Sequence, residues 1–317
     1  MSRIWMAVVL IVSLSRGADA AGWRDKLPPA DKTAQYLQDV SVTIKASSSE
    51  GSGVIVTRII SGAKTNFVWT AAHVVDGLRS VEEVIDPASG TKRQVIKFQD
   101  ARIVKELVES GRRVGELAMD AQVIRFSKTE DLALLKVRKT GFVDASAVFY
   151  LDETIPPIGT KLLHVGSLLG QLGANSMTSG IQSQIGRTLE GVEFDQQTVT
   201  AFPGSSGGGV FLENGAYIAC LVRGAGEGFN LSVPVRRIRK WAIKANIAWA
   251  LDESVAAPSQ ADLEKLPVED SGATFTGTSL KNFPTLIRKV PTEIRILPQI
   301  DSEPRLPALK PFLRQPA

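Results

Sequence analysis

Short segments in which apolar and polar residues alternate dominate the chain from residue 40 onward. Residues 40–44 show the period of two that a half-buried β-strand requires, because successive side chains of a strand point to opposite faces. Further strand-like segments are found at 54–56, 66–70, 132–137, 160–165, 180–185, 196–201, 210–212, 216–222 and 229–233. Polar or glycine-containing turns separate them, and this pattern predicts an all-β protein built from antiparallel barrels.

Polar turns and a proline pair divide the β-rich region into two halves. The turns near residues 140–155 are followed by Pro156 and Pro157, which mark a crossing between the halves. We therefore expect a first barrel over residues 40–148 and a second over residues 149–251. The second would be closed by a helix, because apolar residues recur at helical spacing after residue 235.

Residues 99–119 form a charged segment longer than a simple barrel needs. We interpret this segment as an insertion near residues 99–119 that forms either an amphipathic helix or a long hairpin. It would either gate access to a nearby site or only cover the surface.

The N-terminal end of the chain differs from the β-rich region. Residues 1–20 combine Arg3, an apolar run over 4–14 and small residues at 18–20, which predicts a signal peptide cleaved after Ala20. An uncleaved anchor is the alternative, although eleven apolar residues fall short of the ~20 that a spanning helix needs. We therefore expect an exported protein, periplasmic or secreted, with no stable membrane span after cleavage.

Proline shapes the two segments that flank the barrels. Residues 21–39 contain a proline pair ahead of a helix-compatible stretch, which predicts a helical lead-in. Residues 252–317 hold nine of the sixteen prolines of the chain. This density opposes regular structure, so we expect an extended or disordered tail.

Three residues suited to nucleophilic catalysis occur in the order His73, Asp131, Ser206. Ser206 lies in a glycine-rich turn, where glycine dihedrals allow backbone amides to point at a ligand. A serine hydroxyl becomes a nucleophile when a neutral imidazole takes its proton and a carboxylate orients that imidazole. Both histidines, His73 and His164, precede Ser206, which excludes the α/β-hydrolase arrangement, whose histidine follows the serine.

At these residues the sequence resembles the trypsin-fold serine peptidases, most closely the Deg/HtrA-like branch without its PDZ domain. The matching segments are 51–56, 70–73, 131–135, 204–208, 228–229 and 233–234. The resemblance implies two antiparallel barrels with an active-site cleft between them. It also implies that His73 is the general base, Asp131 its orienting carboxylate and Ser206 the nucleophile, with the amides of Gly204 and Ser206 forming the oxyanion hole.

The resemblance has two departures. The family usually has asparagine or aspartate where this chain has Ser205, and often proline where it has Gly209. Aspartate at the first position pairs with a freed N-terminus in proteolytically activated members. Its absence argues against activation by that route.

The resemblance also implies walls for substrate on either side of the nucleophile. They comprise Thr200, Phe202, Leu221, Val222 and Arg223. Thr200 stands where a trypsin-type pocket has an acidic residue, so we expect an apolar or small side chain at the cleavage point. Val222 and Arg223 would offer backbone groups to an extended peptide, in the manner of an added strand.

Composition narrows the remaining classes of function. The net charge is +4, but the most basic cluster, residues 236–240, lacks neighbouring aromatic residues for base stacking, so we expect a solvated helix face and no nucleic-acid partner. His73 and His164 lie too far apart for metal-ligand spacing, and His164 is interpreted as structural. The single cysteine, Cys220, allows no internal disulfide and is expected to be a buried, inert thiol.

The leading hypothesis from the sequence is an exported serine endopeptidase that works through an acyl-enzyme, without metal or organic cofactor, on protein or peptide substrates. The alternative is a catalytically latent or inactive trypsin-fold protein that binds partners in a chaperone-like manner. The residues leave the oligomeric state open.

Overall fold

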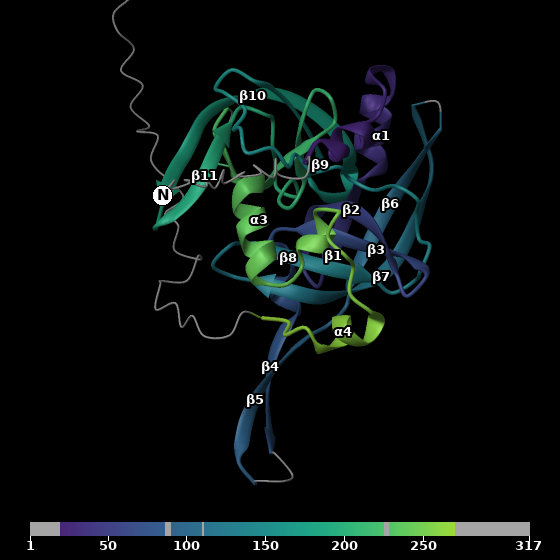
Figure 1. Ribbon diagram of the computed structural model, residues 1–317, viewed down its shortest axis with the longest axis vertical. Helices are drawn as coiled ribbons and strands as arrows, with labels where there is room; N and C mark the ends of the chain where they lie inside the picture. Colours follow the sequence, from purple (N-terminus) through teal and green to yellow (C-terminus); the bar gives the residue numbers. More distant parts are fainter. Residues whose placement is uncertain (1–19, 86–89, 110, 225–227, 270–317) are drawn as a thin grey trace, which may run out of the picture. The chain divides into compact units, whose positions relative to one another are not determined.

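The computed structural model describes residues 20–85, 90–109, 111–224 and 228–269 (Figure 1). The predicted signal peptide therefore lies almost entirely outside the described residues. None of the helices in the described ranges is long and apolar enough to cross a membrane.

Two closed antiparallel barrels make up the fold, which confirms the predicted all-β class. The first has the strand order β1 (Ser41–Ala46), β2 (Ser49–Ile60), β3 (Ala63–Thr70), β8 (Leu132–Val137), β7 (Arg112–Ser127) and β6 (Ala101–Glu109). The second has the order β10 (Gly173–Leu189), β11 (Val192–Gln197), β14 (Asn230–Pro234), β13 (Tyr217–Gly224), β12 (Gly209–Leu212) and β9 (Lys161–Leu168). The period-two segments form these strands because one face of each can be buried in a barrel interior.

Short helices precede and follow the barrels and also lie between strands within them. The lead-in contains η1 (Ala20–Lys26), η2 (Ala30–Lys32) and α1 (Thr33–Asp39). The connections contain α2 (Ala72–Val75), η3 (Asp76–Leu78) and η4 (Gly170–Leu172). The C-terminal side contains α3 (Val235–Lys244), η5 (Ala248–Ala250) and α4 (Gln260–Lys265).

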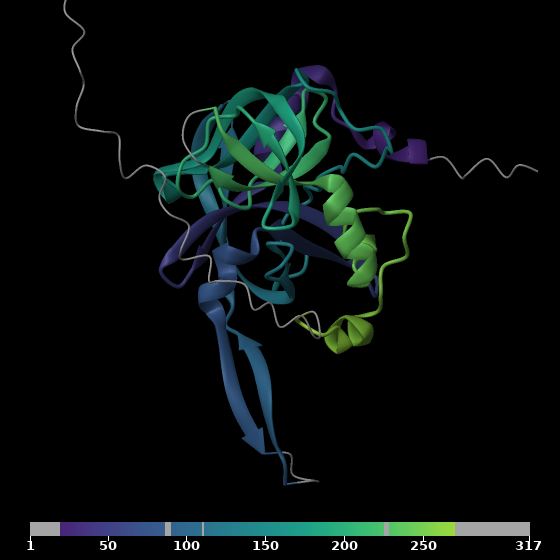
Figure 2. The ribbon, with the colours of Figure 1, turned by 90° about the vertical axis from the view of Figure 1, so that its left-hand side faces the viewer.

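The extra chain between His73 and Asp131 lies in a different place from the one expected. Residues 101–109 and 111–119 form a long hairpin, which is one of the two forms expected, because β6 pairs with residues 112–121 of β7. Both are strands of the first barrel, so this hairpin is not an insertion into it. The additional element is a hairpin of β4 (Arg79–Ile85) and β5 (Lys92–Phe98), which projects from the first barrel (Figure 2). Val81 and Ile85 are largely exposed there, so burial imposed no alternation that the sequence could reveal.

The helix α3 packs against both barrels, although we expected it only to close the second. The indole of Trp241 lies edge-on to that of Trp69 on β3, with ring centroids 5.9 Å apart. Trp249 in η5 meets Phe67 on the same strand at 4.8 Å. These aromatic pairs pack α3 and η5 against the core of the first barrel.

Residues 252–269 contain a helix, α4, which corrects the expectation of an extended or disordered tail for this part of the chain. Ser259 caps α4, because its hydroxyl accepts a hydrogen bond from the Asp262 amide at 3.2 Å. The Phe126 amide then donates to the Val268 carbonyl at 2.7 Å. Pro258 and Pro267 flank the α4 helix and do not interrupt it, which explains how it forms. Residues 270–317 lie outside the described residues.

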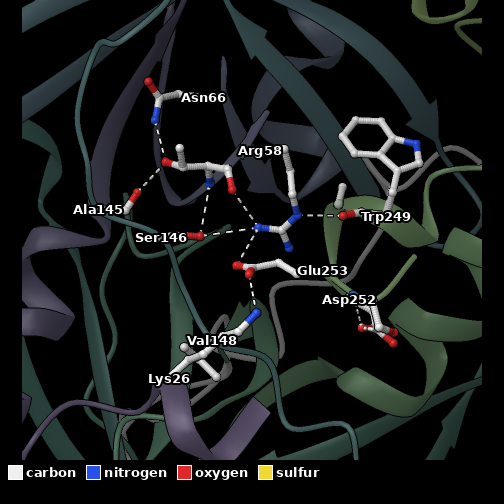
Figure 3. Close-up of polar contacts among 12 residues, drawn as sticks. Lys26, Arg58, Asn66, Ala145, Ser146, Val148, Trp249, Asp252 and Glu253 are labelled. Atoms are coloured by element: carbon white, nitrogen blue, oxygen red, sulfur yellow. Dashed lines mark hydrogen bonds and ion pairs between the residues drawn. The ribbon is translucent and has the colours of Figure 1, made fainter. Parts of the chain in front are cut away.

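A buried arginine on β2 connects the first barrel to this C-terminal segment (Figure 3). The Arg58 Nε donates to the Trp249 carbonyl at 2.6 Å, and another guanidinium nitrogen contacts Glu253 at 3.3 Å and Ser146 Oγ at 3.4 Å. Lys26 from the lead-in also pairs with Glu253. Burial lowers the pKa of Arg58, and the nearby acidic groups oppose that effect.

Candidate active site

The candidate general base lies in the one-turn helix α2, immediately after β3. Ala71 and Ala72 are buried and small, so they leave the imidazole of His73 partly exposed at the side of the first barrel. Its Nδ1 lies 3.0 Å from each carboxylate oxygen of Asp131, and its backbone amide donates to one of them at 3.1 Å. A carboxylate at this distance holds the tautomer in which Nδ1 carries the proton and Nε2 can accept one.

Asp131 lies in the turn between β7 and β8, buried at 4% exposure. Its backbone is left-handed, with φ of 53°, a conformation that aspartate tolerates better than most residues. Burial raises the pKa of this carboxyl, but the hydrogen bonds and charge of His73, together with the charge of Arg223, bring it below its ordinary value. The carboxylate is therefore ionised at neutral pH and available to stabilise an imidazolium.

The glycine-rich turn between β11 and β12 carries the two candidate serines in different surroundings. Ser205 is buried at 1% exposure, and its hydroxyl accepts from the Phe202 amide at 3.1 Å. Ser206 is partly exposed, and its carbonyl accepts from the Ser52 amide at 2.7 Å. Ser205 thus has a structural partner within the turn, whereas the Ser206 hydroxyl makes no hydrogen bond among the described residues.

Close packing brings this turn to the strand that leads to His73. Gly207 has φ of 86°, and a Cβ placed there would lie 2.2 Å from both the Ser52 carbonyl oxygen and Thr70 Oγ1. Only glycine fits such an approach. The glycine-rich turn of the second barrel therefore packs tightly against β2 and the end of β3, next to α2.

Two backbone amides of the turn are available for a ligand. Among the described residues, neither the Gly204 nor the Ser206 amide donates a hydrogen bond. The carbonyls that precede them in the same peptide units are held, because Pro203 accepts from the Leu169 amide at 2.8 Å and Ser205 from the Gly208 amide at 3.0 Å. The N–H and C=O of a trans peptide point in opposite directions, so these bonds orient both free amides.

The residues expected to form the substrate walls differ in their exposure. Thr200 and Phe202 are exposed before the glycine-rich turn of Ser206, called below the nucleophile turn after the role predicted for Ser206, with 49% of Phe202 accessible. Leu221 and Val222 are buried, and the Leu221 backbone is already bonded, because its carbonyl accepts from the Gly207 amide at 2.7 Å and its amide donates to the Gly208 carbonyl at 3.0 Å. Arg223 stacks over Phe194 at 5.4 Å, and its charge acts on Asp131. Sequence reasoning missed this electrostatic link, for which the chain carries no local signal.

The other residues weighed from the sequence lie in the interior. His164 and Cys220 are both fully buried. The ring of His164 donates from Nδ1 to the Gly209 carbonyl at 2.9 Å, and burial lowers its pKa to about 4. Burial also raises the pKa of the Cys220 thiol. In the described part of the chain, no cluster of three or more histidine, cysteine or acidic side chains could hold a metal ion.

Comparisons with known proteins concern the family and the fold of the chain. The family described as "Trypsin-like peptidase domain" matches residues 51–219. The crystal structure of Deg5 is 17% identical, with a TM-score of 0.50 over 74% of this chain and 99% of Deg5. The serine endoprotease from Yersinia pestis is also 17% identical, with a TM-score of 0.47 over 69% of this chain and 67% of that one. No curated protein matches in sequence. At such identity the structural likeness concerns the fold alone.

Proposed function

Because the chain belongs to the family of trypsin-like peptidase domains, we propose that it is a serine endopeptidase that cleaves peptide bonds through an acyl-enzyme on Ser206. The observation that carries the proposal is the paired contact of the His73 Nδ1 with both oxygens of the buried Asp131 carboxylate. An ordinary surface histidine needs no such partner. A general base does, because the carboxylate fixes its tautomer and stabilises its protonated form.

The proposed reaction assigns one task to each group. Ser206 Oγ attacks the peptide carbonyl while His73 Nε2 takes its proton, and the amides of Gly204 and Ser206 stabilise the oxyanion. His73 then gives the proton to the leaving amine, and the acyl-enzyme forms as the C–N bond breaks. Water activated by the same imidazole releases the acid and restores the serine.

We further propose that the substrate is an extended peptide with an apolar or small side chain at the cleavage point. The half-exposed ring of Phe202 supports this choice, as does Thr200 in place of an acidic group. The exposed end of β13 beyond Val222 would pair with the peptide backbone.

Export to the periplasm or the medium is part of the proposal and rests on the signal-like composition of residues 1–20. The intact mass of the protein recovered from an exporting cell tests it. A mass that corresponds to residues 21–317 supports export, and retention of residues 1–20 contradicts cleavage.

Labelling with a fluorophosphonate probe tests the proposed catalysis, because the probe reacts with an activated serine and ignores ordinary ones. We expect the wild-type protein to be labelled, and Ser206→Ala and His73→Ala to lose the label while remaining folded. Ser205→Ala is the matched control and should retain most of the labelling. Equal loss in both serine variants would refute the assignment of the nucleophile. A folded wild-type protein that is not labelled would favour the latent or inactive binding protein.

A further inference from the structure

Ser52 on β2 makes an unusual set of contacts with the nucleophile turn of the other barrel. Its amide donates to the Ser206 carbonyl at 2.7 Å, and its hydroxyl donates to the Gly204 carbonyl at 2.7 Å. The same hydroxyl accepts from the Ser167 amide at 2.7 Å, and the Ser52 carbonyl accepts from Thr70 Oγ1 at 2.7 Å. Every polar group of this residue, 1% exposed, is thus satisfied, and three of the four contacts cross to the second barrel.

These contacts complete a series of anchored carbonyls. The four successive carbonyls of residues 203–206 accept from Leu169 N, Ser52 Oγ, Gly208 N and Ser52 N. The middle peptide unit, between Gly204 and Ser205, lies between the two units that carry the free amides. Within this series, the Ser52 hydroxyl is the one side-chain donor, and it acts on that middle unit.

We propose that Ser52 is a positioning residue that holds the oxyanion hole in its competent arrangement. This inference rests on the proposed function, because it concerns the same site. With φ of 96°, Gly204 has conformational freedom that other residues lack. Its peptide is held at the amide end by the bond from Ser205 to the Phe202 carbonyl at 2.9 Å, and a second anchor at the carbonyl end fixes its orientation. The hydroxyl supplies that anchor, and its second bond to Ser167 on β9 fixes the hydroxyl itself.

Neighbouring residues explain why a serine can perform this task here. A Cβ at Gly51 would lie 3.0 Å from the Ser206 carbonyl oxygen, and one at Gly53 would lie 3.1 Å from the Trp69 carbonyl oxygen. The strand therefore approaches its surroundings closely on both sides of Ser52. Removing the hydroxyl would leave the Ser167 amide and the Gly204 carbonyl without a partner. The middle peptide would then be held only at its other end, where the Ser205 amide donates to the Phe202 carbonyl at 2.9 Å.

The experiment compares the kinetics of fluorophosphonate labelling in the full chain, Ser52→Ala and Ser41→Ala. Ser41 is the matched control, because its buried hydroxyl also donates to a backbone carbonyl, that of Leu37, at 2.7 Å and away from the nucleophile turn. Ser52→Ala should lower the maximal labelling rate by about 10- to 100-fold, less than the ~10²–10³-fold that follows loss of an oxyanion donor itself. The half-saturating probe concentration and the pH midpoint should stay at their wild-type values, because Ser52 contacts neither the probe nor His73.

Each other outcome overturns the inference. Wild-type labelling in Ser52→Ala, equal slowing in Ser41→Ala, or a shifted pH midpoint would show that the hydroxyl does not position the oxyanion hole. If Ser52→Ala fails to fold, Ser52→Cys replaces it, because a thiol is a weak donor of similar shape and should give an intermediate rate. A wild-type rate for Ser52→Cys would also refute the inference. If the wild-type protein itself is not labelled, the proposed function fails and the inference fails with it. If the wild type is labelled, a result that contradicts the expectation for Ser52→Ala refutes the inference alone and leaves the proposed function standing.

Discussion

The buried imidazole of His164 should make the stability of the protein depend on pH in a defined window. Its Nδ1 donates to the Gly209 carbonyl, and its Nε2 has no hydrogen-bond partner among the described residues. Protonation of Nε2 would place an unpaired cation in the core of the second barrel, which is why burial lowers the pKa from 6.5 to about 4.

The sign follows from the lower pKa of the folded state. The unfolded chain takes up a proton below its ordinary pKa, whereas the folded protein does so only near pH 4. The stability that the neutral ring provides is therefore complete above pH 6.5 and is lost as the pH falls towards 4. At ~1.4 kcal/mol per pKa unit, the free energy of unfolding should fall by about 2.5 kcal/mol between pH 7.5 and 4.5 through this residue alone.

Urea unfolding at pH 7.5 and 4.5, in wild type and in His164→Asn, measures this contribution. Asparagine keeps a donor for the Gly209 carbonyl but does not titrate. Carboxyl groups titrate in both proteins and cancel in the comparison. The wild type should therefore lose about 2.5 kcal/mol more than the variant. A difference below about 1 kcal/mol would show that His164 is solvated or charged in the folded state, and would refute the reasoning.

Two further substitutions test the site and its packing. Asp131→Asn should slow fluorophosphonate labelling by about 10³- to 10⁴-fold, because the imidazole loses the group that holds its tautomer. The control Asp120→Asn breaks an exposed ion pair with Arg102, and its labelling rate should stay within about twofold of the wild type. Similar rates for the two variants would remove Asp131 from the site. Gly207→Ala should cost at least about 2 kcal/mol more unfolding free energy than Gly62→Ala, because both positions have left-handed backbones, φ of 86° and 83°, but only a Cβ at Gly207 would meet other atoms within 4 Å. Equal costs in urea unfolding would show that the nucleophile turn is not pressed against β2 and β3.

The sequence indicated which residues to consider for the candidate site, through their order, the local glycine pattern and a family resemblance, and their catalytic roles stay predictions. The order of His73, Asp131 and Ser206 excluded one fold, and the glycines around Ser206 indicated a turn with ligand-facing amides. The structure brings His73 and Asp131 into contact and places the Ser206 turn against the strand that leads to His73. The contribution of Arg223 to the pKa of Asp131 was not readable, because it depends on charges that meet only in the folded chain.

The sequence by itself determined the all-β class, most of the strands and the position of the glycine-rich turn, because alternation and turn chemistry act over a few residues. Only the tertiary structure decided where the extra hairpin lies, that Trp241 and Trp249 pack on the first barrel, and that α4 forms between two prolines. It also decided the contact of Ser52 with Gly204, which joins residues 152 positions apart. Such contacts depend on how the two closed barrels pack against each other. The periodicity of a strand reports only which of its faces is buried within its own barrel, so it does not predict these contacts.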